Sequence, residues 1–143
     1  MKKLISLLLA AVMLTGSLPA ALAASDTSDS VIEQVVRAAE IMVGDSSGSM
    51  NLGSTVTRAE YAKMLVCASA YKDQVSGASN SSPFKDVPYP HWAAGYIKTA
   101  VQQGWISGYL DGSYKPNRTV TLEEAATGVL KLLGYTTSDF SGS

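Results

Sequence analysis

The chain has 143 residues, of which 46% are hydrophobic, and its 11 basic and 12 acidic residues give a formal net charge of −1. This near balance argues against a general nucleic-acid binder, which needs a broad basic face. With one cysteine, the chain cannot form an intramolecular disulfide.

Residues 1–23 have the features of a secretory signal peptide. Lys2 and Lys3 precede the apolar stretch 4–14, and Ala21 and Ala23 form a small-x-small cleavage site. The apolar stretch is too short to span a bilayer, and no second such run follows, so we expect no transmembrane segment. Cleavage near Ala23 would leave nine basic and twelve acidic residues in 24–143. The sequence therefore predicts an exported, slightly acidic protein.

A segment of 28 residues occurs twice, 64 positions apart. Residues 44–71 align without a gap on residues 108–135. The identical pairs include glycines at 44/108 and 48/112 and the pattern Val-Thr-x-x-Glu at 56–60 and 120–124. A repeated unit of this kind normally stacks on its neighbour to bury a shared core. We therefore divide the chain into unit 1 (24–71, with an incomplete start), a flexible linker (72–83), unit 2 (84–135) and a tail (136–143).

The hydrophobic spacing predicts a mainly α-helical fold built from tandem helix–loop–helix units. Helices are expected over 29–43 and 58–71 in unit 1, and over about 93–103 and 122–133 in unit 2. A glycine-rich loop connects the two helices of each unit. Cys67 aligns with Lys131, which predicts a partly exposed helical position for an inert thiol.

The second helix of each unit begins with the spacing of a capping box. The hydroxyls of Thr57 and Thr121 would accept from the amide three residues on, and Glu60 and Glu124 would reach back to the cap amide. This explains all four residues without a ligand.

Arg58 is harder to explain by local structure. It falls at the first helical position, where the helix dipole disfavours a cation by roughly 0.3–1 kcal/mol. Free amides at a helix start together with a guanidinium suit a carboxylate or phosphate. Arg58 is therefore the main candidate for an anion site, the alternative being a solvated side chain of neutral effect.

The second unit resembles the S-layer homology (SLH) family. It begins with Phe-x-Asp-Val at 84–87 and His-Trp-Ala at 91–93, and continues with Gly104-x-x-x-Gly-Tyr-x-Asp-Gly-x-Tyr-x-Pro116. Unit 1 contains the family's Thr-Arg-Ala-Glu signature at 57–60. Such a series of spaced matches over about 50 residues is far more specific than one short motif.

The resemblance implies a pseudo-threefold helical bundle of three units and a non-catalytic role at the cell surface. Grooves between units of the family bind secondary cell-wall polysaccharide, often carrying pyruvate ketals, and its arginine contacts the acidic sugar. That role falls on Arg58, with Trp92, Gly108 and Asp111 as secondary ligand candidates. For Trp92, core packing is favoured over stacking on a sugar, and Asp111 is read as part of a turn.

The sequence departs from the family pattern at three places. Leu122 and Glu123 replace Arg-Ala in unit 2, unit 1 lacks the aromatic opening, and residues 134–143 resemble the lead-in to a third unit. Unit 2 therefore loses a cation, and we expect at most one working anion site. An alternative function is a structural surface-layer protein that self-associates through its units.

We expect no enzymatic activity, cofactor or metal. The sequence offers no nucleophile–base pair, metal-ligand cluster or paired carboxylates, and its only histidine, His91, is read as part of a helix start.

Overall fold

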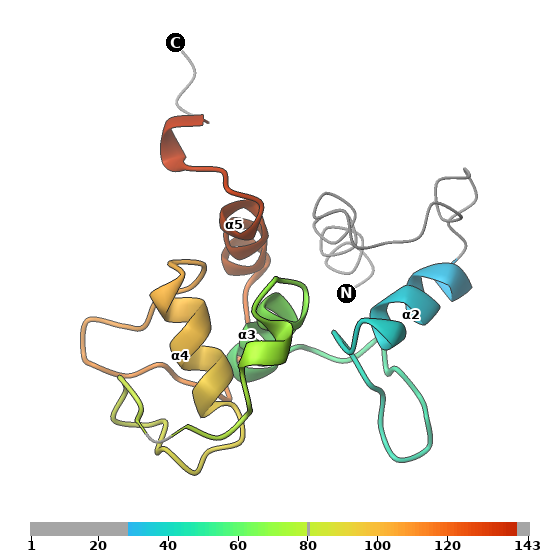
Figure 1. Cartoon of the computed structure of the whole chain (residues 1–143), viewed down its shortest axis with the longest axis horizontal. Helices are drawn as coiled ribbons and strands as arrows, with labels where there is room; N and C mark the ends of the chain where they lie inside the picture. The colour runs from blue at the N-terminus through green and yellow to red at the C-terminus, as the bar shows by residue number, and fades with distance from the viewer. Residues whose placement is uncertain (1–28, 80, 140–143) are drawn as a thin grey trace.

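The computed structural model describes residues 29–79 and 81–139, and this part of the chain is mainly helical, as expected (Figure 1). The predicted signal peptide lies outside the described residues. The α-helices are α2 (Asp29–Ala38), α3 (Arg58–Cys67), α4 (Ala94–Gln102) and α5 (Leu122–Leu132), and 3-10 turns are formed by η2 (Lys72–Gln74) and η3 (Thr137–Asp139). Within these residues the β-structure consists of one isolated antiparallel bridge, between Thr57 and Thr119.

Helices α3 and α5 both begin with a capping box. In α3 the Thr57 amide donates to Glu60 Oε2 over 2.7 Å, and the Glu60 amide donates to Thr57 Oγ1 over 3.3 Å. In α5 the corresponding Thr121–Glu124 bonds measure 2.9 and 3.1 Å. These bonds satisfy amides that have no partner within the helix.

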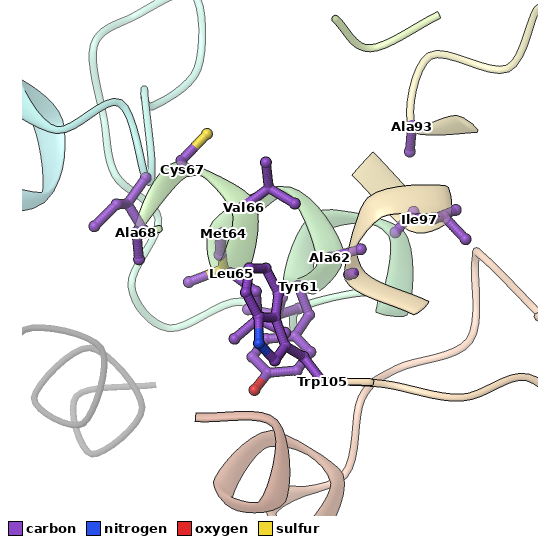
Figure 2. Packing of buried hydrophobic residues seen from close by; sticks show 14 of the residues in the cluster. Tyr61, Ala62, Met64, Leu65, Val66, Cys67, Ala68, Ala93, Ile97 and Trp105 are labelled. Atoms are coloured by element: carbon purple, nitrogen blue, oxygen red, sulfur yellow. The ribbon is translucent and has the colours of Figure 1, made fainter. Parts of the chain in front are cut away.

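Helix α3 lies at the centre of the fold, with α4 and α5 packed against it (Figure 1). Eight of the ten residues of α3 are buried, and only Glu60 and Lys63 are not. The helix therefore has no continuous polar face. Figure 2 shows part of this cluster, with Ile97 of α4 and Trp105 among its members. Cys67 is also buried, so its expected partial exposure is wrong, and burial raises the pKa of its thiol.

The backbone repeats with the same 64-residue period as the sequence. The amides of Asp45 and Tyr109 donate to Ser49 O and Ser113 O over 2.9 and 2.8 Å. The period extends upstream of residue 44, beyond the sequence identities, because Ile41 and Trp105 each donate to the carbonyl five residues earlier over 3.0 Å. Left-handed conformations also recur, at residues 40/104, 48/112 and 51/115. Helix α4 is thus the equivalent of α2, and α5 that of α3.

The segment between the units contacts α4. The Gly95 amide donates to Gly77 O over 2.8 Å. A Cβ on Gly95 would lie 2.0 Å from Ser76 O, and one on Gly77 would lie 2.3 Å from Trp92 O. Both glycines therefore permit a close backbone approach that a side chain would prevent.

Candidate functional site

A groove of about 420 Å³ lies where the closing helix of unit 1 meets the glycine loop of unit 2. We call it the unit 2 groove. Its lining residues come from α3, from the loop after α4 and from the first three turns of α5: Arg58, Trp105, Ile106, Ser107, Gly108, Tyr109, Arg118, Thr121, Glu123, Glu124, Thr127 and Lys131. The site is therefore shared between the two units.

Arg58 belongs to unit 1 in sequence but makes its side-chain contacts in unit 2. Its guanidinium donates to Tyr114 O over 2.9 Å, to Ser107 O over 2.6 Å and to Glu124 Oε1 over 2.7 Å. The residue is only 5% exposed. The alternative expectation for Arg58, a solvated side chain of neutral effect, is therefore wrong, because three internal acceptors hold the guanidinium.

Two tyrosines of unit 2 flank the Arg58 guanidinium. The Arg58 Cζ atom lies 4.6 Å from the ring centroid of Tyr114 and 5.0 Å from that of Tyr109. The Tyr114 hydroxyl in turn donates to Arg58 O over 2.9 Å, and the hydroxyl is buried. Cation–π contacts of this kind add to the charged hydrogen bonds and fix the plane of the guanidinium.

Glu124 combines two roles. One carboxylate oxygen caps α5, and the other accepts from both Arg58 and Arg118, over 2.7 and 3.0 Å. Partial burial alone would raise the pKa of this carboxyl. The Thr121 amide and the two guanidinia oppose burial, and the pKa of Glu124 lies below its ordinary value. Glu124 is therefore ionised near neutral pH.

The groove carries two further cations that the sequence reading missed. Arg118 is 41% exposed at its side chain, contacts the Tyr109 hydroxyl and pairs with Glu124. Lys131 lies seven residues after Glu124 on α5 and is exposed. The repeat alignment contained the signal, because Arg118 and Lys131 replace Ser54 and Cys67 of unit 1.

The three secondary candidates occupy different places. Gly108 lines the unit 2 groove, and a Cβ there would lie 2.0 Å from the ring of Phe84. The Asp111 carboxylate accepts from the amide and hydroxyl of Ser113, over 2.9 and 2.6 Å, within the glycine-loop turn. Trp92 is 49% exposed, so its expected core position is wrong. It lines the other groove described below.

Unit 1 has an equivalent groove of about 400 Å³, which we call the unit 1 groove. Eight of its lining residues are the 64-residue equivalents of residues that line the unit 2 groove: Ile41, Met42, Val43, Gly44, Asp45, Ser54, Glu60 and Lys63. Its other lining residues include Met50, Val56, Met64 and Trp92. The unit 1 groove is thus the more apolar version of the same site.

Asp45 in the unit 1 groove is held as a carboxylate by its own loop. The hydroxyl of Ser47, the Asn51 side chain and nearby amides lower its pKa to about 2. Within residues 29–79 and 81–139 no cluster of three or more His, Cys, Asp or Glu could hold a metal ion. Over the same residues no helix has the length and apolar character needed to cross a membrane.

Residues 83–126 match the model of the S-layer homology domain. The chain is 32% identical to a surface layer protein of Brevibacillus choshinensis over 94% of its own length and 13% of that protein. It is 30% identical to a middle cell wall protein of Brevibacillus brevis, over 94% and 14% of the two chains. A cellulosome-anchoring protein of Acetivibrio thermocellus is 33% identical over 66% of this chain and 21% of its own. The chain thus spans a small part of each relative.

Proposed function

Because the chain carries an S-layer homology domain and its relatives are surface-layer and anchoring proteins, we propose that it is a non-catalytic module that attaches to the cell wall. The ligand in this proposal is an acidic secondary cell-wall polysaccharide, and its carboxylates, such as those of pyruvate ketals, bind in the unit 2 groove. The observation that carries the proposal is the convergence of three cations from two units on one groove.

The cations have different roles in this proposal. Arg58 is held by three internal acceptors and is nearly inaccessible, so it shapes the groove and adds positive charge to its lining without contacting the ligand. Arg118 and Lys131 reach solvent and make the direct contacts with a carboxylate. A guanidinium can donate two parallel hydrogen bonds to the two oxygens of one carboxylate, and this geometry favours carboxylates over other anionic groups that cannot accept both bonds.

Acidic residues in the groove set a limit on binding. Glu123 and Glu124 line the same groove, so its formal charge is +1 when Arg58, Arg118 and Lys131 are counted. A net charge this small gives modest affinity for any one sugar. Attachment to a wall polymer would then depend on the many acidic sugars along the polysaccharide, because the protein can rebind to a neighbouring sugar after it dissociates from one.

The test is co-sedimentation of the purified protein with cell walls before and after removal of the secondary polymer. We expect binding to untreated walls and its loss on stripped walls. Arg118→Ala and Lys131→Ala should each weaken binding roughly tenfold without loss of fold, because both side chains are exposed. Leu122→Ala, an exposed change at the start of the same helix, is the matched control.

Two results would overturn the proposal. Unchanged sedimentation with stripped walls would exclude the polymer as the ligand. Unchanged sedimentation of an Arg118→Ala/Lys131→Ala double variant would exclude the unit 2 groove as the binding site.

A further inference from the structure

A turn that follows the glycine loop differs in charge between the two units. In unit 2 the amide of Arg118 donates to Lys115 O over 3.1 Å, which closes a β-turn between these residues. In unit 1 the amide of Ser54 closes the equivalent turn on Asn51 O over 2.8 Å. The two ends of the turn are therefore neutral in unit 1 and cationic in unit 2.

The first residue of this turn reaches back to the glycine loop in both units. Asn51 and Lys115 both have a left-handed backbone, with φ of 45° and 57°. Asn51 Nδ2 donates to Asp45 Oδ2 over 2.6 Å, and Lys115 Nζ lies 4.1 Å from the ring centroid of Tyr109. Tyr109 is the 64-residue equivalent of Asp45. The same backbone geometry thus places an amide on a carboxylate in unit 1 and an ammonium on an aromatic ring in unit 2.

Tyr109 contacts three cations without cancelling their charge. Besides Lys115, the Cζ atoms of Arg58 and Arg118 lie 5.0 and 5.8 Å from its ring centroid. Its hydroxyl also accepts a hydrogen bond from the Arg118 guanidinium. An aromatic ring attracts a cation through its quadrupole and has no net charge, whereas a carboxylate such as Asp45 would neutralise one cation. Tyr109 therefore holds the cations in place and leaves their charge available to an anion from outside.

The charge of Lys115 is not compensated within the described residues. Glu124 pairs with Arg118 over 3.0 Å, but no carboxylate of these residues forms an ion pair with the Lys115 ammonium. The Asp111 carboxylate accepts from the hydroxyl and amide of Ser113 instead. Those two bonds lower the pKa of Asp111, and the charge of Lys115 makes only a smaller contribution. Since Lys115 is also exposed, a ligand can reach it.

We propose that Tyr109 makes the unit 2 groove selective for acidic ligands, because it positions Arg118 and Lys115 around one ring. Lys115 then contacts the acid from the rim of the groove, in addition to the contacts of Arg118 and Lys131. This inference rests on the function proposed above and deepens it, since it names the residues that select an acidic sugar over a neutral one. Tyr109 is a positioning residue in this arrangement and need not touch the acid.

The physical basis of this role is preorganisation. Lysine and arginine side chains lose much rotamer freedom when a ligand fixes them, and this loss weakens binding. The ring of Tyr109 already restricts Lys115, and its hydroxyl already restricts Arg118. The turn adds to the effect, because its hydrogen bond keeps the two residues close together. An incoming acid therefore meets cations that are already in position.

The first test is calorimetric titration of the full chain with soluble polysaccharide released from cell walls, before and after its carboxylates are reduced to alcohols. Lys115→Asn should weaken binding of the untreated polysaccharide roughly fivefold, and its difference from wild type should disappear with the reduced polysaccharide. Asparagine is the unit 1 residue and suits a left-handed backbone, so the fold is kept. Lys115→Arg should bind like wild type. Lys98→Gln, which removes a charge outside both grooves, is the matched control.

A second set of variants tests the positioning role of Tyr109. Tyr109→Phe keeps the ring and loses the hydroxyl contact with Arg118, so we expect binding about threefold weaker. In an Arg118→Ala background the same change should have no further effect, because the hydroxyl acts through Arg118. Tyr109→Asp introduces the unit 1 carboxylate among the cations and should weaken binding at least roughly thirtyfold. Thermal unfolding of each variant shows that the folded state is what is being titrated.

The outcomes distinguish this inference from the proposed function. A wild type that does not bind the untreated polysaccharide overturns both. If wild type binds but Lys115→Asn binds as Lys98→Gln does, only the inference made here is overturned. The same holds if Lys115→Asn weakens binding of the untreated and the reduced polysaccharide equally. A loss in Tyr109→Phe that persists in the Arg118→Ala background overturns the positioning role.

Discussion

Replacement of Arg58 by alanine separates a structural role from a ligand-binding role. The guanidinium is almost inaccessible and donates to one carboxylate and two backbone carbonyls of unit 2. Loss of one partner of a buried ion pair costs about 3–5 kcal/mol. Glu124 remains 30% exposed at its side chain and keeps its bond to Arg118, which lowers this cost. We therefore expect Arg58→Ala to lower the free energy of unfolding by about 2–4 kcal/mol.

Equilibrium unfolding in urea, followed by the fluorescence of buried Trp105, measures this loss. With a slope of about 1.5 kcal/mol/M, a loss of 3 kcal/mol lowers the midpoint by about 2 M. Arg58→Lys should recover only part of it, because one ammonium cannot reach all three acceptors. Leu122→Ala, at the equivalent position of unit 2, should change stability by no more than about 0.5 kcal/mol.

The result that would refute the reasoning is an Arg58→Ala variant with unchanged stability. If that variant also lost wall binding, Arg58 would be a direct ligand contact, and the internal hydrogen bonds would contribute nothing measurable. If stability fell while the folded fraction still bound walls, the ligand contacts would lie with the exposed cations instead.

Three further predictions concern packing, pH and thiol chemistry. Gly108→Ala should lower the free energy of unfolding by about 1–3 kcal/mol, because its Cβ would lie 2.0 Å from the ring of Phe84; a normal melting temperature would contradict this. Because the pKa of Glu124 is lowered in the folded state, its ionised carboxylate stabilises the fold at every pH above the ordinary glutamate pKa of about 4.3. This contribution is lost as the pH falls through the folded-state pKa. The difference in melting temperature between wild type and Glu124→Gln should therefore shrink from pH 6 to pH 3, and a constant difference would refute it. Buried Cys67 should react with a thiol reagent only after unfolding, and rapid labelling of the native protein would contradict its burial.

Local signals in the sequence were sufficient for the helices. Val-Thr-x-x-Glu predicts the start of α3 and α5 because a capping box needs only two residues three positions apart, and both starts are observed at 58 and 122. The expected ends were less accurate. α3 stops at Cys67 rather than near 71, since tertiary contacts and not local pattern decide the last turn.

The position of the groove needed information that no local pattern contains. Arg58 and its acceptors are 49 to 66 residues apart in sequence, so its burial depends on how one unit stacks on the next. Trp92 shows the opposite error, because a large aromatic at a helix start remained half exposed. The alignment of the two units shows a cation lost from unit 2, where Leu122 replaces Arg58. It also shows a cation gained in unit 2, where Arg118 replaces Ser54, and the sequence prediction did not use it.

The shared arginine also affects how this protein can be divided. The family match covers residues 83–126, whereas the guanidinium beneath its groove is supplied by residue 58. A fragment cut at the edges of the match would lose α3 and would leave Tyr109, Tyr114 and Glu124 around an empty space. The smallest fragment that can be moved into another protein with its groove intact therefore begins before α3. Unit 2 alone, although it is one repeat of the sequence, cannot be transferred with a complete groove.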